Sequence, residues 1–305
     1  MRMNSAAHEG EAVSTEKSRT LWSDAWLRLR KKKLATLCMA YLVAIVLAAI
    51  TAELWVPPLF GDPTLINTQT MAEERLLPPS IEHPFGTDEM GRDLFGRVIY
   101  GARISIPIGV ASVALCVLLG VTLGAVSGYF GRLTDSVIMR FTEMVLVFPT
   151  MLLLVLIFGI FPVRGPIPVV LALGLLSWPG FARLFRGSVI EAKEKEYVDS
   201  ARALGAGHRR IMFGHISRNA LAPVLVLATM SIGGMLLAES ALSFLGLGIQ
   251  PPSVSWGRMI ESGAVRLTTN PGLVLFPGVA ILATVLAFTL LGESLGEALD
   301  VKTRE

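Results

Sequence analysis

The sequence is poor in charged residues and cysteine, and each scarcity excludes a class of protein. Charged residues make up 17% of the 305 residues, whereas soluble domains usually carry about a quarter. Cys38 and Cys116 both lie in apolar runs, so neither a disulfide framework nor a zinc site is indicated. We expect both cysteines to be small packing residues.

The chain also lacks several motifs of catalytic and nucleotide-binding sites. It contains no G-x-x-x-x-G-K-[ST] phosphate loop and is not expected to bind ATP by that route. H-E-x-x-H and C-x-x-C are absent, and none of the four histidines lies in an apolar run. We therefore expect a protein that is not an enzyme and that holds no catalytic residue, no metal and no cofactor.

Long apolar runs are what the sequence has in abundance. Hydrophobic residues make up 52% of the chain, and its mean hydropathy is +0.60. A bilayer core of about 30 Å needs roughly 20 apolar residues per helix. This criterion predicts an all-α, polytopic membrane protein with six spans, at 34–56, 104–127, about 137–161, 166–185, 221–245 and 271–292.

The distribution of lysine and arginine predicts the orientation of the chain. The run RLRKKK precedes the first span, and the 186–220 loop is rich in basic residues. Loops 57–101 and 248–270 have fewer basic residues. Because basic segments stay in the cytoplasm, we expect both termini and the 186–220 loop to be cytoplasmic and the other two loops to be outside.

Small residues recur every four positions along the second predicted span. They are Ser112, Cys116, Gly120, Gly124 and Gly128. Small side chains at this spacing line one stripe of a helix and allow another backbone to approach closely. The pattern predicts a tight helix–helix interface, and ordinary glycine enrichment in membrane helices is the alternative.

A polar segment, EYVDSARALGAGHRRIMFGHISR, interrupts the apolar second half of the chain. We predict an amphipathic helix that ends at Gly205, followed by a short helix over about 208–216. The predicted apolar face consists of Ile190, Tyr197, Ala201 and Leu204. The projection either lies on lipid headgroups or fits a groove on a cytoplasmic partner.

An overlapping stretch, DSARALGAGHRRIMFGHISRN (199–219), resembles the EAA loop of ATP-binding-cassette (ABC) importer permeases. Residues 199–201 match the small-residue trio of that loop, and Gly205 matches its glycine. ARALGA and the HI..N pattern resemble the dipeptide, oligopeptide and nickel branch, although Ser217 and Arg218 stand where that branch has Leu-Pro. The resemblance implies an ATPase-coupling loop that includes Glu196, Asp199, Ser200, Ala201, Arg202, Gly205, Ala206, His215 and Asn219.

Two further stretches resemble the same branch, in the expected order. HPFGTDEMGRDLFGRVIYGARIS is similar to the segment before the second span, and GLGIQPPSVSWG to the outer loop before the last. The resemblance implies a C-type permease subunit with the type I ABC importer transmembrane fold. Its parts are a disordered cytoplasmic tail (1–20), an N-terminal module with the first span (21–60), an extracytoplasmic loop (61–101), the permease domain (102–297) and a cytoplasmic tail (298–305).

The first of these stretches also has a direct interpretation. We expect a turn at Pro84, a helix capped by Thr87 or Asp88, and a local pair between Arg92 and Asp93. A metal site made from His83, Asp88 and Asp93 is the minor alternative, because one histidine in a capped turn is usually structural. The extracytoplasmic motif comprises Gly86, Thr87, Asp88, Gly91, Arg92 and Asp93.

Charges inside predicted spans indicate function or pairing, because an unpaired one costs about 2.5–3.5 kcal/mol on insertion scales. Glu239, Ser240 and Ser243 in the fifth span are candidate pathway or gate residues, and we favour a structural or gating role over solute binding. Arg140 and Glu143 are predicted to pair on one helix face. Glu53 and Arg183 lie near span ends and are interpreted as anchors or local pairs.

The resemblance implies the permease subunit of an ATP-driven importer of peptides or a related small solute, such as a nickel chelate or glutathione. Such a subunit works in the cell membrane with a homologous second permease, two ATPase subunits and an extracytoplasmic binding protein, and without nucleic acid. An ion-coupled secondary transporter acting alone is the alternative, which predicts inverted repeats and more mid-membrane ionisable residues. A membrane scaffold is the third hypothesis.

Overall fold

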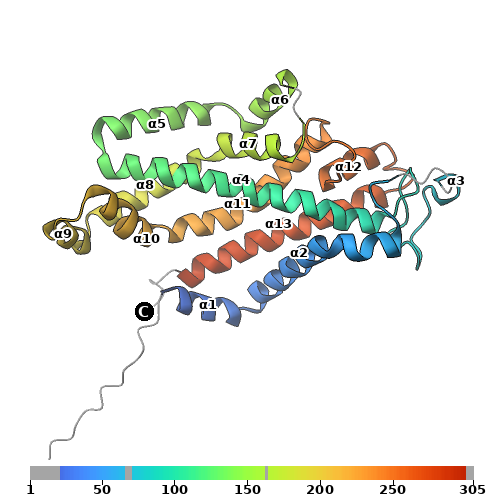
Figure 1. Cartoon of the computed structure of the whole chain (residues 1–305), viewed down its shortest axis with the longest axis horizontal. Coiled ribbons are helices and arrows are strands. Elements are labelled where there is room, and N and C mark those ends of the chain that lie inside the picture. The colour runs from blue at the N-terminus through green and yellow to red at the C-terminus, as the bar shows by residue number, and fades with distance from the viewer. Residues whose placement is uncertain (1–20, 66–70, 162–163, 300–305) are drawn as a thin grey trace, which may run out of the picture.

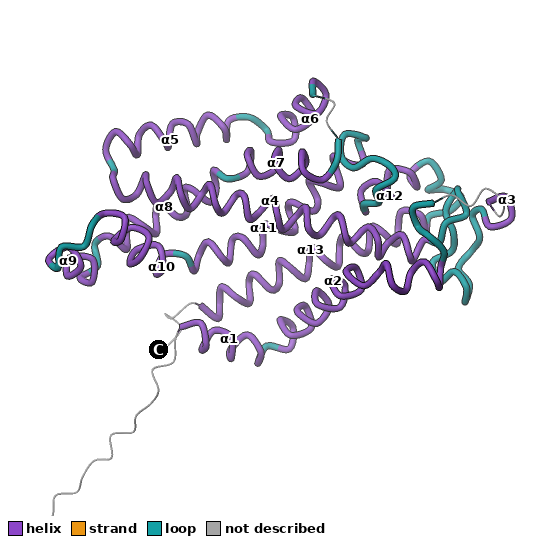
Figure 2. Tube along the Cα trace, in the orientation of Figure 1, coloured by secondary structure: helices purple, strands orange, loops and turns teal. Residues whose placement is uncertain are grey.

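The computed structural model describes residues 21–65, 71–161 and 164–299, and helices are the regular elements of that part (Figures 1 and 2). The first half contains α1 (Leu21–Lys31), α2 (Lys33–Phe60), α3 (Met71–Glu74), α4 (Leu94–Phe130), α5 (Arg132–Val147) and α6 (Thr150–Ile160). The second half contains α7 (Pro166–Ser177), α8 (Pro179–Lys193), α9 (Glu196–Ala203), the π-helix η1 (Arg210–Ile216), α10 (Ser217–Ala220), α11 (Ala222–Phe244), α12 (Trp256–Ala264) and α13 (Gly272–Leu299). The predicted tail at 1–20 lies outside the described residues, and so does the predicted tail at 298–305 except for residues 298 and 299, which are the last residues of α13.

The predicted membrane spans correspond to four single helices and two bent pairs. Within the described residues, α2, α4, α11 and α13 are each long and apolar enough to cross a membrane. The third and fourth predicted spans are α5 with α6, bent by 79°, and α7 with α8, bent by 46°. Pro149 and Pro179 stand at these breaks, where proline cannot donate the backbone hydrogen bond that would continue the preceding helix.

α4 is the central helix, and its stripe of small residues packs tightly against α8. A methyl group added at Gly124 would lie 2.6 Å from the carbonyl oxygen of Ala182, and one at Gly128 would lie 2.9 Å from that of Arg186. Cys116 is fully buried on the same stripe. The predicted helix–helix interface is therefore confirmed, because only small residues permit this approach of two backbones.

The bundle is elongated, and its two ends differ. Figure 1 shows α9 at one end, which we call the α9 end, and α3 at the other, the α3 end. α1 packs against the last turns of α13, where Leu29, Ala35 and Ala298 form a small buried cluster. The first and last described helices therefore meet toward the α9 end (Figure 1).

The polar segment after α8 differs from the predicted amphipathic helix. α8 ends at Lys193 and α9 begins at Glu196. Because the helix is interrupted there, the buried face of α9 does not continue the helical spacing of α8. The prediction of the buried face was therefore wrong except at one position. The buried side chains are Val189, Ala192, Val198 and Ala201, whereas Ile190, Tyr197 and Leu204 are exposed. The second predicted helix is the π-helix η1, which continues into α10.

Candidate functional site

The polar arm, which we define as residues 194–220, projects from the α9 end of the bundle (Figure 1). It is held by one apolar cluster that it shares with α4 and α8. The arm contributes Val198, Ala201, Ile211, Met212, Ile216 and Ala220, and the bundle contributes Tyr129, Phe185 and Val189 among others. Because these side chains are buried together, the arm is a packed extension of the bundle.

Gly205 ends α9 as the sequence predicted. Its φ is +76°, which a residue with a side chain adopts only at a cost. The N–H of Gly205 donates to the carbonyl of Arg202 at 2.9 Å, and the N–H of Ala206 donates to that of Ala201 at 3.0 Å. These bonds satisfy the last carbonyls of the helix and set the direction in which the chain turns toward η1.

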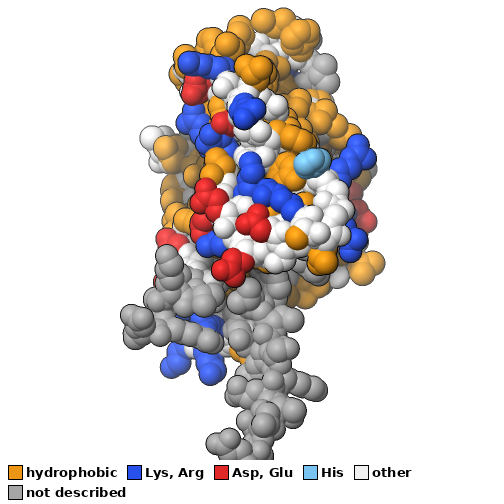
Figure 3. Space-filling view, turned by 90° about the vertical axis from the view of Figure 1, so that its left-hand side faces the viewer, with side chains coloured by type: hydrophobic (Ala, Val, Ile, Leu, Met, Phe, Trp, Pro, Cys, Tyr) orange, Lys and Arg blue, Asp and Glu red, His pale blue; other side chains and the backbone are white. Residues whose placement is uncertain are grey.

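The outward side of the arm is charged, and Leu204 is its most exposed large apolar side chain among the described residues. Asp199 and Arg202 form an ion pair at 3.0 Å, Glu196 and Ser200 are exposed, and Leu204 is 88% exposed. Figure 3 looks onto the α9 end and shows basic and acidic side chains mixed there. An exposed apolar anchor in a polar rim is typical of a protein contact surface. The side chains of His215 and Asn219 lie outside the described part.

The arm is tied to the helices that cross the bundle. The hydroxyl of Tyr129, at the end of α4, and Nδ1 of His208 on the arm are hydrogen-bonded at 2.8 Å. Lys193 Nζ, at the end of α8 directly before the arm, donates to the carbonyl of Tyr129 at 2.8 Å and joins α8 to α4. Only Leu221 separates α10 from α11. A displacement of the arm therefore acts on α4, α8 and α11 together.

Glu239 on α11 is fully buried, and its carboxyl group accepts hydrogen bonds from three hydroxyl groups, of which that of Ser240 is the longest at 3.5 Å. Ser105 on α4 donates to Oε2 at 3.1 Å, and Ser243 donates to Oε1 at 2.8 Å. Ser105 itself accepts the N–H of Trp256 at 3.2 Å, and Ser243 accepts that of Ile249 at 3.1 Å. Each serine hydroxyl therefore donates to the carboxyl group and accepts a backbone N–H, so it links Glu239 to the chain around Ile249 or Trp256.

This network fixes the start of α12 against α4 and α11. The ring of Trp256 is fully buried, and its Nε1 donates to the carbonyl of Val98 at 2.8 Å. A methyl group at Gly101 would lie 2.6 Å from that ring, so the contact depends on glycine. Glu239, Ser240 and Ser243 thus lie together in an enclosed network. Its enclosure favours the gating or structural role over solute binding.

The 83–93 loop forms a compact structure at the α3 end, with partners that differ from the predicted ones. Asp93, and not Thr87 or Asp88, caps α4, because its Oδ1 accepts the N–H of Gly96 at 2.6 Å. The predicted Arg92–Asp93 pair was also wrong. Asp93 pairs with His83 at 2.9 Å, and Arg92 pairs with Asp88 at 2.8 Å. The turn brings Asp88 and Arg92 together, which the linear sequence does not reveal.

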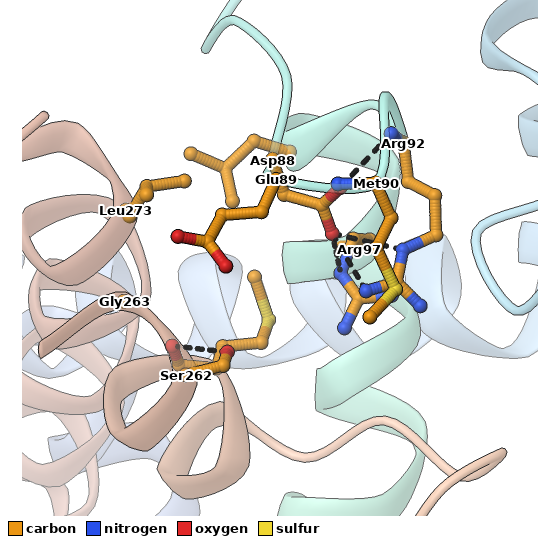
Figure 4. A pocket seen from close by; sticks show the side chains of 10 residues that line it. Asp88, Glu89, Met90, Arg92, Arg97, Ser262, Gly263 and Leu273 are labelled. Atoms are coloured by element: carbon orange, nitrogen blue, oxygen red, sulfur yellow. Dashed lines mark hydrogen bonds and ion pairs between the residues drawn. The ribbon is translucent and has the colours of Figure 1, made fainter. Parts of the chain in front are cut away.

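Asp88 lies between two arginines beside a small cavity (Figure 4). Arg92 and Arg97 reach it at 2.8 and 3.3 Å, and Glu89 pairs with Arg266 at 2.6 Å. The cavity of about 50 Å³ is also lined by Met259, Ser262, Gly263 and Leu273. The loop is therefore docked on α12 and α13. No group of three or more side chains placed to share a metal ion is found among the described residues.

Replacing Asp93 with alanine is expected to lower the free energy of unfolding by about 1–2 kcal/mol, because the helix cap is lost. Burial raises the pKa of the Asp93 carboxyl, while the Gly96 N–H and the His83 ring act in the opposite direction. Asp93→Asn keeps a capping oxygen, so its free energy of unfolding should fall by less than that of Asp93→Ala. Thermal unfolding in detergent measures both variants, and equal losses would show that the cap is not the stabilising contact.

A short pattern near the C-terminus matches a nucleophile motif but not its geometry. Residues 292–296 read GESLG, which fits G-x-S-x-G. In hydrolases that serine stands exposed on a sharp strand-to-helix turn. Here all five residues lie inside α13, and Ser294 is buried. The pattern is therefore part of a packed helix.

Nearly the whole chain matches known protein families and known proteins. The profile described as "binding-protein-dependent transport system inner membrane component" matches residues 120–305, and "N-terminal TM domain of oligopeptide transport permease C" matches residues 20–79. The chain is 38% identical to the oligopeptide transport system permease protein OppC of Bacillus subtilis, over 98% of this chain and 96% of that protein. It is 39% identical to the dipeptide transport system permease protein DppC of Alkalihalophilus pseudofirmus, over 93% of this chain and 90% of that protein. It is 36% identical to the glutathione transport system permease protein GsiD of Salmonella typhimurium, over 99% of this chain and 98% of that protein.

Solved structures show the same fold at low sequence identity. An inward-facing form of the MetNI methionine ABC transporter superposes with a TM-score of 0.55 at 15% identity, over 67% of this chain and 96% of that one. An amino acid ABC transporter gives a TM-score of 0.52 at 18% identity, over 67% of this chain and 94% of that one. The likeness shows the type of helical bundle, and it leaves the solute to be argued separately.

Proposed function

This chain belongs to the binding-protein-dependent transport system inner membrane components, the permease subunits of ABC importers, and on that premise we propose that it imports peptides. Family membership sets aside the ion-coupled secondary transporter acting alone. Three relatives are named for oligopeptide, dipeptide and glutathione transport, and all these solutes are peptides. Which peptide is carried rests with the binding protein that delivers it.

The polar arm is the proposed contact with the ATPase subunits. The observation that carries this proposal is that a packed, charged projection with Leu204 at its outer side is continuous with α8 and α11. In this arrangement the arm, the N-terminus and the C-terminus are cytoplasmic. ATP is bound and hydrolysed by two partner ATPase subunits, and this chain contributes no catalytic group and no cofactor.

The proposed route of force runs along α11 from the arm to the α3 end. α11 has 23 residues and is therefore about 35 Å long. Closure of the ATPase subunits moves the arm, and α11 passes the movement to the Glu239 network and to the start of α12. Such a change is a switch between two packed arrangements. ATP drives it only by binding the two arrangements with different affinity.

The α3 end is the proposed site of solute delivery. The 83–93 loop and α12 form its surface, and the Glu89–Arg266 pair joins them to the loop before α13. An extracytoplasmic binding protein delivers the solute to this end, and a homologous second permease completes the pathway. In this scheme Glu239 acts as a gate residue, because it holds the delivery surface against the helix that the ATPase moves.

Copurification tests the proposed function directly. ATPase chains are expected to copurify with the tagged protein, and Leu204→Asp is expected to reduce them about 10-fold, because a charge replaces the exposed apolar anchor. The control is Leu65→Asp, since Leu65 is also exposed, at 66%, but lies outside the arm. Absence of ATPase chains from the wild-type preparation would contradict the proposal, as would equal losses in the two variants.

A further inference from the structure

A groove between α5 and α8 carries a group of charged side chains that belongs neither to the arm nor to the Glu239 network. Its volume is about 520 Å³, and it is lined by Asp135, Ser136, Met139, Arg140, Glu143, Arg183 and Arg186. Glu143 lies eight residues beyond Asp135, so the charges extend about 12 Å along α5 toward the middle of the bundle. The groove is therefore a polar feature within candidate membrane spans.

α5 exposes two different faces. Ser136, Arg140 and Glu143 follow one another at spacings of four and three residues, which places them on one stripe. A second, apolar stripe consists of Leu133, Val137, Phe141 and Met144, each more than half exposed. At 100° per residue the two stripes point about 90° apart. The apolar stripe suits lipid or an apolar partner, whereas charges at membrane depth face the interior of an assembly or a water-filled cavity.

The charges in the groove leave one arginine without a carboxylate. Arg186 pairs with Asp135 at 2.5 Å, and Arg140 pairs with Glu143 at 3.2 Å. Arg183 is exposed and has no ion pair among the described residues, although the sequence predicted an anchor or a local pair there. Three guanidinium groups minus two carboxylates give an excess of one positive charge in the lining.

We propose that this groove is part of the solute path and that Arg183 binds the carboxylate of the transported solute. The inference rests on the proposed function, because it requires a solute with a free carboxylate, as a peptide has at its C-terminus. A guanidinium group recognises a carboxylate through two parallel N–H hydrogen bonds. Arg140 and Glu143 are 79% and 49% exposed, so their pair is open enough to exchange with the amino end of the solute.

The test uses the complete importer with its binding protein in proteoliposomes, with a peptide and the same peptide amidated at its C-terminus. At saturating loaded binding protein, Arg183→Gln is expected to slow uptake of the free peptide about 10-fold, and of the amide less than about 2-fold. The same binding protein is used in every measurement, so its own preference between the two peptides cancels from the ratio of variant to wild-type uptake. Arg183→Lys keeps the charge and should restore most of the uptake.

The control is Lys33→Gln, which removes an exposed positive charge at the start of α2, outside the groove. Equal slowing of both peptides, or no slowing, overturns the role of Arg183. A defect that occurs only in vesicles with anionic lipid also overturns it, since Arg183 would then bind lipid phosphate. If Arg183→Gln does not assemble, Arg183→Met carries the same expectation. A wild-type importer that takes up neither peptide with ATP would instead refute the proposed function.

Discussion

Gly205→Val is expected to lower ATP-driven uptake about 10-fold while the protein still reaches the membrane. The φ of Gly205 is +76°, and a left-handed conformation costs an L-residue about 1–2 kcal/mol, with a β-branched side chain at the upper end. To relieve that strain the turn after α9 has to change its direction. Leu204 and the Asp199–Arg202 pair then no longer have the orientation that the proposed ATPase contact requires.

Gly207 provides a matched control within the same turn. No atom lies within 4 Å of a methyl group added at either glycine, and a left-handed φ is recorded for Gly205 alone of the two. Gly207→Val should therefore retain most of the uptake, and Gly205→Asn should lie between, because asparagine tolerates this conformation. Uptake and solute-stimulated ATP hydrolysis are measured in proteoliposomes. Equal activity of the two valine variants would remove the coupling role of the turn.

Glu239→Ala is expected to abolish uptake and to lower the free energy of unfolding by about 2–5 kcal/mol. The substitution removes the acceptor for two buried hydroxyl groups, those of Ser105 and Ser243. It also leaves a cavity where the network now joins α4, α11 and the start of α12. Glu239→Gln keeps the volume but places an amide donor where a hydroxyl also donates, so it should lose roughly half as much stability.

The control for Glu239→Gln is the same substitution at a more exposed glutamate on α12, which removes a charge without disturbing a buried network. Glu261 pairs with Arg258 at 2.7 Å and is 33% exposed. Glu261→Gln should therefore cost less than about 1 kcal/mol. Thermal unfolding of the complex gives the stability, and the amount of solute imported per ATP hydrolysed gives the coupling. A gate role predicts that Glu239→Gln lowers that ratio, and an unchanged ratio would reduce Glu239 to a stabilising residue.

Several features follow from the sequence because they depend on composition or on neighbours along the chain. The length of the apolar runs predicted the spans, and a spacing of four predicted the small-residue stripe that packs on α8. Gly205 ends α9, and Arg140 pairs with Glu143 at 3.2 Å, because residues three apart share a helix face. The likeness of three short stretches to one permease branch predicted the family.

Other features were decided by the tertiary structure, because they depend on residues far apart or on a local break. The interruption between α8 and α9 rotated the arm, so Val198 is buried where Tyr197 was expected. The fold of the 83–93 loop made Asp93 the cap of α4. Ser105 donates to Glu239 across 134 positions of sequence, and no local pattern in an apolar run identifies such a partner. Spacing along one helix is a property of the sequence, whereas the pairing of two helices is set by how the whole bundle packs.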